Sequence, residues 1–345
     1  MTDLPDFAAI AAAARVADHA DDPLPGWAGL ATLFGASPAS VGGEAPPPEA
    51  WVAAGVPFDA TSSSRPGAAE GPRAVRAASV IYASGLKSWR ATEMVDMRTL
   101  DRFAYAAPVL IDTGDFPVYP TDLLRTFASV SGHARTLLES ARRAIFLQGD
   151  HSVTFPTFAG YRAARPGRRL GFVNVDHHFD FGNWSAIHGA LYHGSNSRRI
   201  SELPGMRPRD IAFVGVGDVT RAEQYEWLLS KGFHVVRAAD IRREGAARAL
   251  ASAVAHLAEE CDGVYVSLDI DVLDASVAPG TGNVTMGGLA AGELLDVFEQ
   301  LRELPIEVLD VAEVSPRHDP TGRTAQIAAR VLFEFLFREP TKKVP

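Results

Sequence analysis

The sequence contains almost no cysteine, because Cys261 is the only one in 345 residues. A disulfide within the chain is therefore impossible, and a metal site built from several cysteine thiolates is excluded. A single thiol is typical of a protein that works in a reducing compartment. We therefore expect a cytoplasmic protein.

Positive charge is also in deficit: 33 Lys and Arg against 42 Asp and Glu give a net charge of -9. Binding to nucleic acid or to an anionic membrane needs a basic patch, so neither partner is expected.

Long hydrophobic runs are missing too. The alanine-rich run 8–14 is too short to span a bilayer and follows acidic residues, which favours an N-terminal helix over a signal peptide. A small molecule with positive charge is the better candidate partner.

Hydrophobic residues make up 47% of the chain, which is enough for a large core. From residue 144 onward, short and almost continuously apolar runs alternate with amphipathic segments, as is typical of strands covered by helices on both faces. We therefore predict an α/β protein with three layers and a mostly parallel central sheet. Strands are expected near 51–56, 109–112, 144–147, 170–175, 211–215, 233–237, 264–268 and 306–311, and helices near 72–79, 121–143, 155–164, 221–231, 242–260, 289–302 and 323–337.

The first 50 residues differ from the rest in composition, being rich in alanine and then in proline and glycine. Such a segment favours an N-terminal arm, residues 1–50, laid over a catalytic domain, residues 51–345. A partly mobile tail is the alternative interpretation of the same composition.

Potential ligands follow three of the predicted strands. Asp150-His151-Ser152 follows the first, Asp176-His177-His178-Phe179-Asp180 the second and Asp269-Ile270-Asp271 the third. Ligands bind at the carboxyl ends of strands in such sheets, so we expect the three segments to meet. If the backbone stays extended beyond residue 175, Asp176, His178 and Asp180 point the same way.

Two imidazoles, His151 and His178, would join four carboxylates at this place, and four carboxylates repel one another unless cations neutralise them. Two divalent ions would do so. An oxygen-rich set with one imidazole per ion suits manganese better than zinc or copper, with nickel or cobalt as alternatives. Two ions about 3.5–4 Å apart lower the pKa of a shared water, so hydrolysis is the reaction class indicated. The carboxylates are Asp176, Asp180, Asp269 and Asp271.

These segments resemble the signatures of the arginase/agmatinase superfamily of ureohydrolases. Residues 148–152 are similar to Gly-Gly-Asp-His-Ser, 176–180 to Asp-Ala-His-x-Asp, and 267–275 to Ser-x-Asp-x-Asp-x-x-Asp-Pro, with Pro-Gly-Thr-Gly at 279–282. The resemblance covers roughly residues 51–337 and implies an arginase-like fold. It implies that one ion is held by His151 and Asp180, the other by His178 and Asp271, and that Asp176 and Asp269 bridge them.

The same resemblance implies which residues handle the substrate. His193 stands where the family has a histidine that passes a proton to the leaving amine, with His188 as a rival. Glu313 stands at the position of a glutamate that pairs with the substrate's guanidinium. Asp271 is expected to steady the tetrahedral intermediate as well as to bind metal. Asn183, Glu313 and His193 are the expected substrate contacts.

The chain departs from the family pattern around these residues. Gln148 replaces a glycine, His177 replaces an alanine, and Asn283-Val284-Thr285-Met286 replaces a Thr-Pro-Glu-Val-like loop. Arginases carry Arg-Asp-x-Asp where this chain has Gly217-Asp218-Val219-Thr220, so the carboxylate that reads arginine's amino group is missing. Segments 26–34, 55–59 and 64–73 look like the agmatinase branch, although Ser195-Asn196-Ser197 argues against a standard agmatine pocket.

We therefore predict a binuclear amidinohydrolase, with manganese preferred and nickel possible, that hydrolyses a C–N bond and releases urea from a guanidino compound other than arginine. Agmatine, guanidinobutyrate, guanidine and biguanides are the candidates. The alternative enzyme is a formiminoglutamase. An alternative of another class is a non-catalytic subunit of a hetero-oligomeric ureohydrolase. A deacetylase of related fold is a further alternative, which would need a single metal. The resemblance also implies a homo-oligomer, a trimer or a hexamer.

Overall fold

A computed structural model describes residues 31–43, 45–89 and 92–340. Its centre is a nine-stranded sheet in the order β1-β5-β2-β6-β11-β10-β7-β8-β9. Every pair of neighbouring strands in it is parallel, as predicted. The strands are β1 (Ser37–Pro38), β2 (Trp51–Val56), β5 (Leu110–Asp115), β6 (Arg143–Gln148), β7 (Leu170–Val175), β8 (Ile211–Val216), β9 (His234–Arg237), β10 (Gly263–Asp269) and β11 (Ile306–Ala312).

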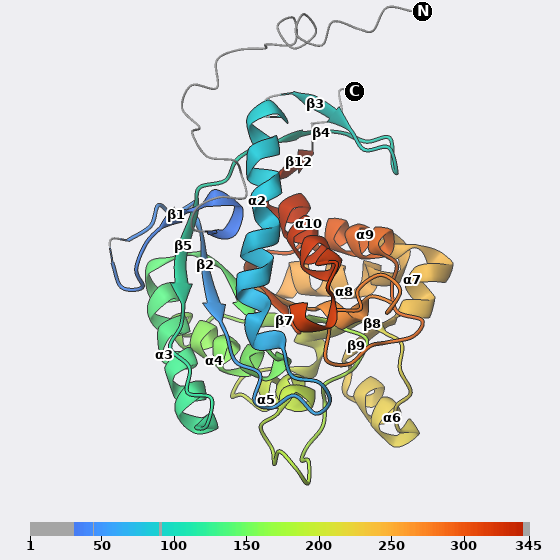
Figure 1. Ribbon diagram of the computed structural model, residues 1–345. Helices are drawn as coiled ribbons and strands as arrows, with labels where there is room; N and C mark the ends of the chain where they lie inside the picture. The colour runs from blue at the N-terminus through green and yellow to red at the C-terminus, as the bar shows by residue number, and fades with distance from the viewer. Residues whose placement is uncertain (1–30, 44, 90–91, 341–345) are drawn as a thin grey trace, which may run out of the picture.

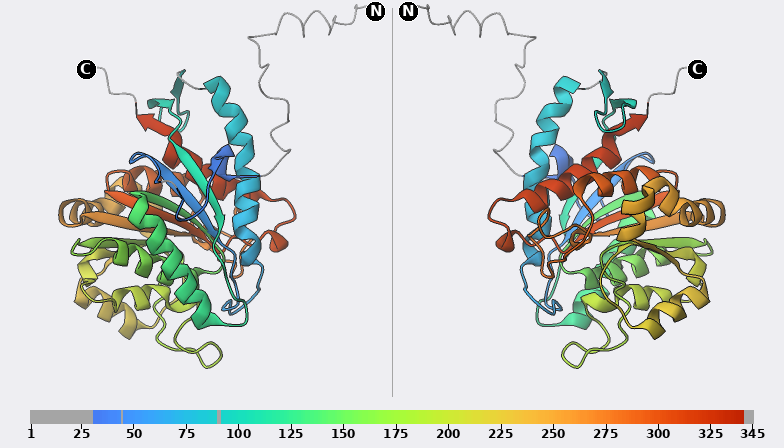
Figure 2. Two further views of the ribbon diagram at one scale, coloured as in Figure 1. Left: turned by 90° about the vertical axis from the view of Figure 1, so that its left-hand side faces the viewer. Right: turned by 90° about the vertical axis from the view of Figure 1, so that its right-hand side faces the viewer.

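Helices cover both faces of the sheet, which confirms the three-layer prediction (Figures 1 and 2). One face carries α2 (Gly71–Trp89), α7 (Ala238–Glu244), α8 (Ala246–Glu260), α9 (Ala291–Leu301) and α10 (Arg323–Phe337). The other carries α3 (Leu123–Ser140), α4 (Thr154–Ala164), α5 (Asn196–Ser201) and α6 (Ala222–Lys231).

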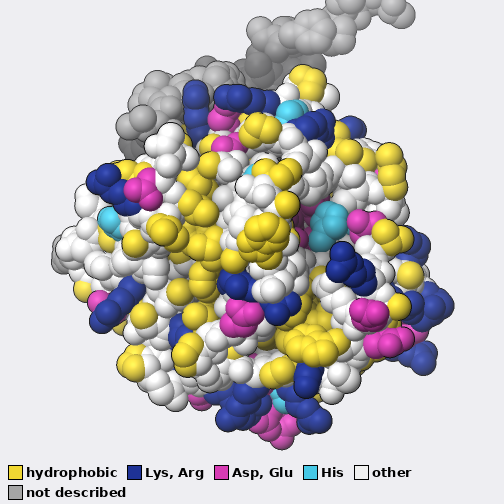
Figure 3. Space-filling model, turned by 90° about the horizontal axis from the view of Figure 1, so that it is seen from below, with side chains coloured by type: hydrophobic (Ala, Val, Ile, Leu, Met, Phe, Trp, Pro, Cys, Tyr) yellow, Lys and Arg dark blue, Asp and Glu magenta, His cyan; other side chains and the backbone are white. Residues whose placement is uncertain are grey.

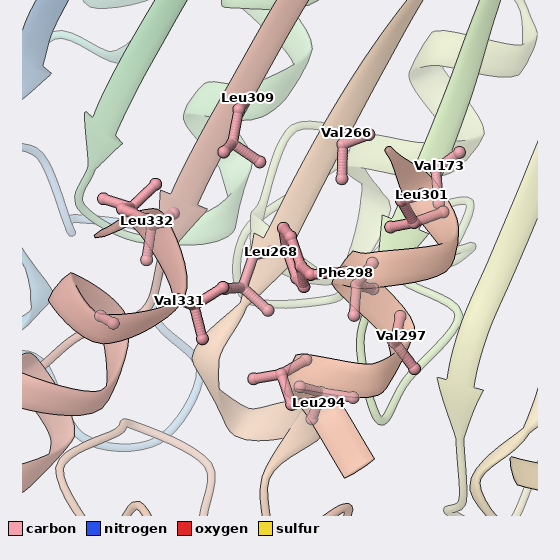
Figure 4. Packing of buried hydrophobic residues seen from close by; sticks show 14 of the residues in the cluster. Val173, Val266, Leu268, Leu294, Val297, Phe298, Leu301, Leu309, Val331 and Leu332 are labelled. Atoms are coloured by element: carbon pink, nitrogen blue, oxygen red, sulfur yellow. The ribbon is translucent and has the colours of Figure 1, made fainter. Parts of the chain in front are cut away.

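The central strands send alternate side chains into two separate cores. In β10, Val266 and Leu268 join the core beneath α9 and α10, whereas Tyr265 joins the core beneath α3 and α4. Successive side chains of a strand point to opposite faces, so a strand between two helical layers must be apolar at every position. Figure 4 shows Leu268 near Phe298 of α9, and Val266 further along β10 near Leu301 of the same helix.

The secondary structure differs from the prediction in several places: α2 continues to Trp89 rather than ending at residue 79, and α5 and β1 were not expected. The helix expected over 242–260 is broken at Gly245, whose φ of 80° and ψ of 153° are not helical, so α7 and α8 are separate. A three-stranded sheet, β12-β4-β3, was not expected. Its strands β3 (Glu93–Val95), β4 (Arg102–Tyr105) and β12 (Arg338–Pro340) are too short to show a clear period.

The predicted N-terminal arm is described only in part. The helix expected at 8–14 lies outside the described residues, and so does most of segment 26–34. The described remainder contributes Ser37–Pro38, which pairs with β5 at the edge of the large sheet. The division into an arm and a domain at residue 50 stays a prediction.

Because the strands are parallel, their carboxyl ends all lie on the same side of the sheet, the lower side in Figure 1, away from the small sheet. The ligand-bearing segments follow β6, β7 and β10 at this edge, and β11 lies between β6 and β10. Within the described part of the chain, no helix combines the length and the apolar character needed to cross a membrane.

Candidate metal centre and active site

The same small turn leads the chain out of each of the three strands. The carboxylate of Asp150 accepts a hydrogen bond from the backbone N–H two residues later (3.1 Å), and Asp176 (2.7 Å) and Asp269 (2.9 Å) do the same. Aspartate favours this turn because its side chain replaces a backbone acceptor. Each turn therefore holds a carboxylate at the end of a strand.

The backbone does not stay extended after β7, so the simple alternation expected for residues 176–180 is wrong. The chain bends at His177 and His178, and Asp180 has a φ of 46°, in the left-handed region. Residues other than glycine occupy this region at a cost of about 1–3 kcal/mol, usually where a site requires it. The three side chains nevertheless converge, through the bend rather than through an extended strand.

The first group of potential ligands surrounds His151, which is completely buried. Its Nδ1 lies 2.9 Å from Asp180 Oδ2, 3.1 Å from Asp269 Oδ2 and 3.5 Å from Asp176 Oδ2. These four residues come from three different strand ends. They offer ligand atoms within 4.8 Å of one another.

A second group lies next to the first and shares Asp176 with it. His178 Nδ1 is 3.3 Å from Asp176 Oδ1 and 3.4 Å from Asp271 Oδ2. The two oxygens of Asp176 thus face different imidazoles, as expected of a carboxylate between two cations. Asp269, the other expected bridge, contributes an atom only to the first group.

The protonation of His151 follows from its hydrogen bonds. Its Nε2 lies 2.8 Å from Ser267 Oγ, and this hydroxyl donates its own proton to Asp310 Oδ1 at 2.6 Å. Ser267 must therefore accept from His151, which puts the ring proton on Nε2 and leaves a lone pair on Nδ1. An imidazole held in this way is oriented for metal binding.

Gln148, one of the departures from the family pattern, belongs to the same buried network. Its Nε2 donates to Asp310 Oδ2 (2.9 Å), and its Oε1 accepts from Thr154 (2.8 Å). Tyr265 also donates to Asp310 (2.5 Å). Burial raises the pKa of the Asp310 carboxyl to about 6, although these donors oppose the shift. Gln148 therefore helps to hold the acceptor that orients Ser267 and His151.

The unsatisfied atoms of the cluster fit a pair of divalent cations. His151 Nδ1 and Asp271 Oδ1 are buried without a hydrogen-bond partner. Burial, together with the neighbouring Asp271 and Asp176, raises the pKa of Asp269 well above its usual range. Burial also raises the pKa of Asp271 to about 7. Unpaired lone pairs and crowded carboxyls are costly unless cations bind them, so the donor set suits hard or borderline divalent ions.

His193 and Glu313 lie beside this cluster and contact each other. His193 Nδ1 is 3.1 Å from Glu313 Oε1, which also accepts from the backbone N–H of His151 at 2.9 Å. Burial lowers the pKa of His193, but the Glu313 carboxylate and nearby acids outweigh burial and raise it to about 9. Glu313 has a φ of 62°, a second left-handed residue at the site. The geometry brings His193, and not His188, to Glu313.

Four contacts of this site were not found from the sequence. Ser63 Oγ lies 2.7 Å from His193 Nε2, and Thr61 binds Asp150 through both its N–H (2.9 Å) and its hydroxyl (2.8 Å). Asn196 donates to Asp180 (2.8 Å), and Asn174 donates to Asp176 (3.0 Å). All four are short polar residues, and only Asn196, within the unusual Ser195-Asn196-Ser197, gave a signal in the sequence.

A cavity of about 210 Å³ opens next to His178, and its lining includes His177, Tyr192, Asp218 and Val219. Figure 3 shows this face of the molecule, where a histidine side chain lies among acidic ones near the middle. The expected substrate contact Asn183 is exposed and accepts from Arg199 at 3.0 Å, outside the cavity lining. His188 stacks on Tyr192. The substrate role of Asn183 stays a prediction.

The chain is similar to known proteins over most of its length. A family model described as the Arginase family matches residues 49–337. An agmatinase of Edwardsiella ictaluri is 31% identical over 294 residues, which are 85% of this chain and 89% of that protein. A mitochondrial guanidino acid hydrolase of Homo sapiens is 30% identical over 289 residues, 83% of this chain and 77% of that protein.

Solved structures share the fold. One titled as a hypothetical agmatinase from Burkholderia thailandensis superposes with a TM-score of 0.72 at 28% identity, covering 90% of each chain. The strand order, the helical layers and the sequence likeness thus agree.

Proposed function

This chain belongs to the arginase family and is an amidinohydrolase of the ureohydrolase type, and on that premise we propose that it releases urea from a guanidino compound other than arginine at a centre of two divalent metal ions. The observation that carries the proposal is the pair of ligand groups that share Asp176 and lie beside the His193–Glu313 contact. The segment 217–220 lacks the second carboxylate of arginases, which supports a substrate without arginine's amino acid end.

Six residues would hold the ions. His151 and Asp180 would bind one ion, His178 and Asp271 would bind the other, and Asp176 and Asp269 would bind both. Manganese suits this oxygen-rich set, and nickel is the alternative. When bound, two such ions lower the pKa of a water molecule and so supply a nucleophile at neutral pH. Asp271 Oδ1 has no hydrogen-bond partner among the described residues and is available to accept a hydrogen bond from the reacting groups.

The protein's own groups orient the substrate and move the proton. Glu313 Oε1 already binds two N–H donors, and a planar guanidinium presents donors of the same kind. His193 holds a proton at Nδ1 against Glu313. With a pKa near 9 it is charged at neutral pH, so it can protonate the departing amine. Asn183 would contact the outer part of the substrate after releasing Arg199.

Other functions receive less support. The relatives at 30% and 31% identity carry names for guanidino substrates, which disfavours formiminoglutamase. A non-catalytic subunit has no need of four clustered carboxylates with unpaired atoms. A deacetylase would need one metal, whereas the ligands here form two groups. We place the protein in the cytoplasm, on the strength of its single, buried Cys261, and propose a homo-oligomer.

The test is metal content measured together with urea release. The full chain is loaded separately with manganese and with nickel and assayed with agmatine, guanidinobutyrate, guanidine, a biguanide, arginine and formiminoglutamate. We expect about two ions per chain and urea from a guanidino compound other than arginine. Asp271→Asn should lose metal and turnover while keeping the fold. One ion per chain, or release of formamide instead of urea, would overturn the proposal.

A further inference from the structure

The cavity beside His178 is adjacent to the candidate metal centre and shares two residues with it. His178 and Asp180 belong both to the ligand groups and to the cavity lining. A guanidinium held at Glu313 and the metal ligands would therefore leave its N-substituent to extend from the centre. Among the described cavities, this one lies next to the ligands and can take the substituent, given the function proposed above.

The cavity wall carries carboxylates but no Lys or Arg among the described residues. Its ionisable side chains are those of Asp180, Asp218, Tyr192 and two histidines. The Asp218 carboxylate is about half exposed and lies 3.9 Å from His178 Nε2. Because Asp180 faces the ligand cluster, Asp218 is the carboxylate left to meet a substituent.

The arginines closest to this wall in the sequence are not part of its lining, although Arg198 lies over the ring of Phe181, 5.7 Å from its centroid. Arg198 and Arg199 both pair with Glu202, and Arg199 also donates to Asn183. Arg221 is exposed at the start of α6 and does not line the cavity. A substrate carboxylate in the cavity would therefore face Asp218 with no Lys or Arg in the described lining to pair with.

The rest of the wall suits a chain of methylene groups with a polar end. Val216, Val219 and Phe181 supply apolar surface, and Tyr192, Thr220 and Gln224 supply hydrogen-bonding groups. His177 closes the wall beneath Asp218: its backbone carbonyl accepts from the N–H groups of Gly217 (3.0 Å) and Asp218 (3.4 Å). Neither ring nitrogen of His177 has a hydrogen-bond partner among the described residues.

We propose that this cavity binds the N-substituent of the guanidino substrate and that Asp218 selects substituents that are cationic or uncharged over those that end in a carboxylate. Like charges placed together in a partly buried site weaken binding strongly, whereas an ammonium group beside Asp218 strengthens it. The preferred substrate is then an alkylguanidine or aminoalkylguanidine rather than a guanidino acid.

The experiment compares three compounds whose substituents have matched length and different charge: agmatine, butylguanidine and 4-guanidinobutyrate. With the metal-loaded full chain, we expect kcat/KM for the first two to exceed that for the acid by about tenfold or more. Asp218→Asn should raise KM for agmatine about tenfold, leave butylguanidine unchanged and improve the acid. Glu223→Gln removes the same charge from an exposed site on α6 outside the cavity lining and should change none of the three.

Several outcomes would overturn the inference. One such outcome is that 4-guanidinobutyrate is the best substrate. Another is that Asp218→Asn slows turnover of all three compounds alike, which would mean that Asp218 acts only by orienting His178. Binding of the three compounds, measured by calorimetry, is independent of turnover. If none binds in the cavity while free guanidine yields urea, this inference fails and the proposed function stands. If the three bind in the expected order without urea from any compound, the proposed function fails instead.

Discussion

The imidazole of His177 occupies the space that a side chain at Gly217 would need. A Cβ on Gly217 would lie 2.3 Å from His177 Cε1 and 2.8 Å from Nδ1. The two residues are also joined through the backbone, because the carbonyl of His177 accepts from the N–H of Gly217. Two departures from the family pattern, in segments far apart in the sequence, are therefore one structural unit beside the metal ligands.

Gly217→Ala should displace His177. We expect a loss of about 1–3 kcal/mol of stability from overpacking and a higher KM, since the displaced ring lies in the wall of the substrate cavity. Denaturant unfolding and steady-state kinetics measure the two effects. The double variant His177→Ala/Gly217→Ala removes the clash and should regain much of the stability, so additive losses in the double-mutant cycle would contradict the contact.

Ser267→Ala should weaken metal binding without touching a ligand. It removes the acceptor that holds the proton on His151 Nε2, so the lone pair on Nδ1 is no longer fixed. The loss of such a partner typically costs 10–100-fold in metal affinity. Competition with a chelator measures the metal affinity of the variant and of the wild-type chain.

Thr157→Val is the matched control for Ser267→Ala. It also removes a buried hydroxyl of the same network, the one that binds Gln148 Nε2 at 3.0 Å, but it does not contact His151. It should lower stability and leave metal affinity nearly unchanged. An equal loss of affinity in both variants would mean that general loosening, and not the orientation of His151, is responsible.

The sequence was enough to predict the strands and the ligand segments because both signals are local. The run from Val264 to Leu268 is apolar except at Ser267, which indicates a strand covered on both faces, and Asp269 and Asp271 follow it closely. Parallel pairing then brings the ends of β6, β7 and β10 to one edge without any knowledge of tertiary contacts. The resemblance to a family added the roles of the individual ligands, which remain proposals.

The remaining contacts depend on pairings between distant segments, which no local pattern encodes. Ser63 lies 130 residues before His193, and Gln148 reaches Asp310 across 162 residues. A serine in a Ser-rich loop and a glutamine at a strand end look like ordinary polar residues in the sequence. The break at Gly245 was missed for a different reason, since the apolar period continues from α7 into α8 across a single glycine.

Ser63→Ala should slow turnover more than it raises KM. The backbone N–H of Ser63 donates to His193 Nε2 when this nitrogen is unprotonated (3.2 Å), and its hydroxyl can accept when it is protonated (2.7 Å). Without the hydroxyl, charged His193 loses a partner and its pKa should fall. The alkaline limb of the kcat profile should then move to lower pH.

Ser64→Ala is the control for Ser63→Ala, because Ser64 is exposed and its side chain makes no hydrogen bond in the described structure. It should leave the pH profile in place. An alkaline limb that does not move in Ser63→Ala, despite slower turnover, would assign Ser63 a role in holding its loop rather than in positioning His193.

The stability of the metal-free protein should fall as pH rises from about 4 to 7, in a window set by the buried carboxyls. Burial raises the pKa of Asp271 to about 7 and that of Asp150 to about 6, against about 3.9 in the unfolded chain. The folded state therefore holds protons that the unfolded state has already lost, and stability decreases with pH across this range. The raised pKa of His178, where burial is outweighed by Asp271 and Asp176, acts in the same direction.

Divalent ions should reverse this trend, because they bind the deprotonated ligands and bind more tightly as pH rises. Melting temperatures measured with chelator and with manganese should therefore diverge between about pH 4 and 7, the metal-free curve falling and the loaded curve staying level or rising. Asp271→Asn removes one of the groups with a raised pKa, so its metal-free curve should be flatter than that of the wild-type chain. Parallel curves with and without metal would show that the ions do not bind these carboxyls, and the cluster around Asp176 would then need another explanation for its unpaired, crowded charges.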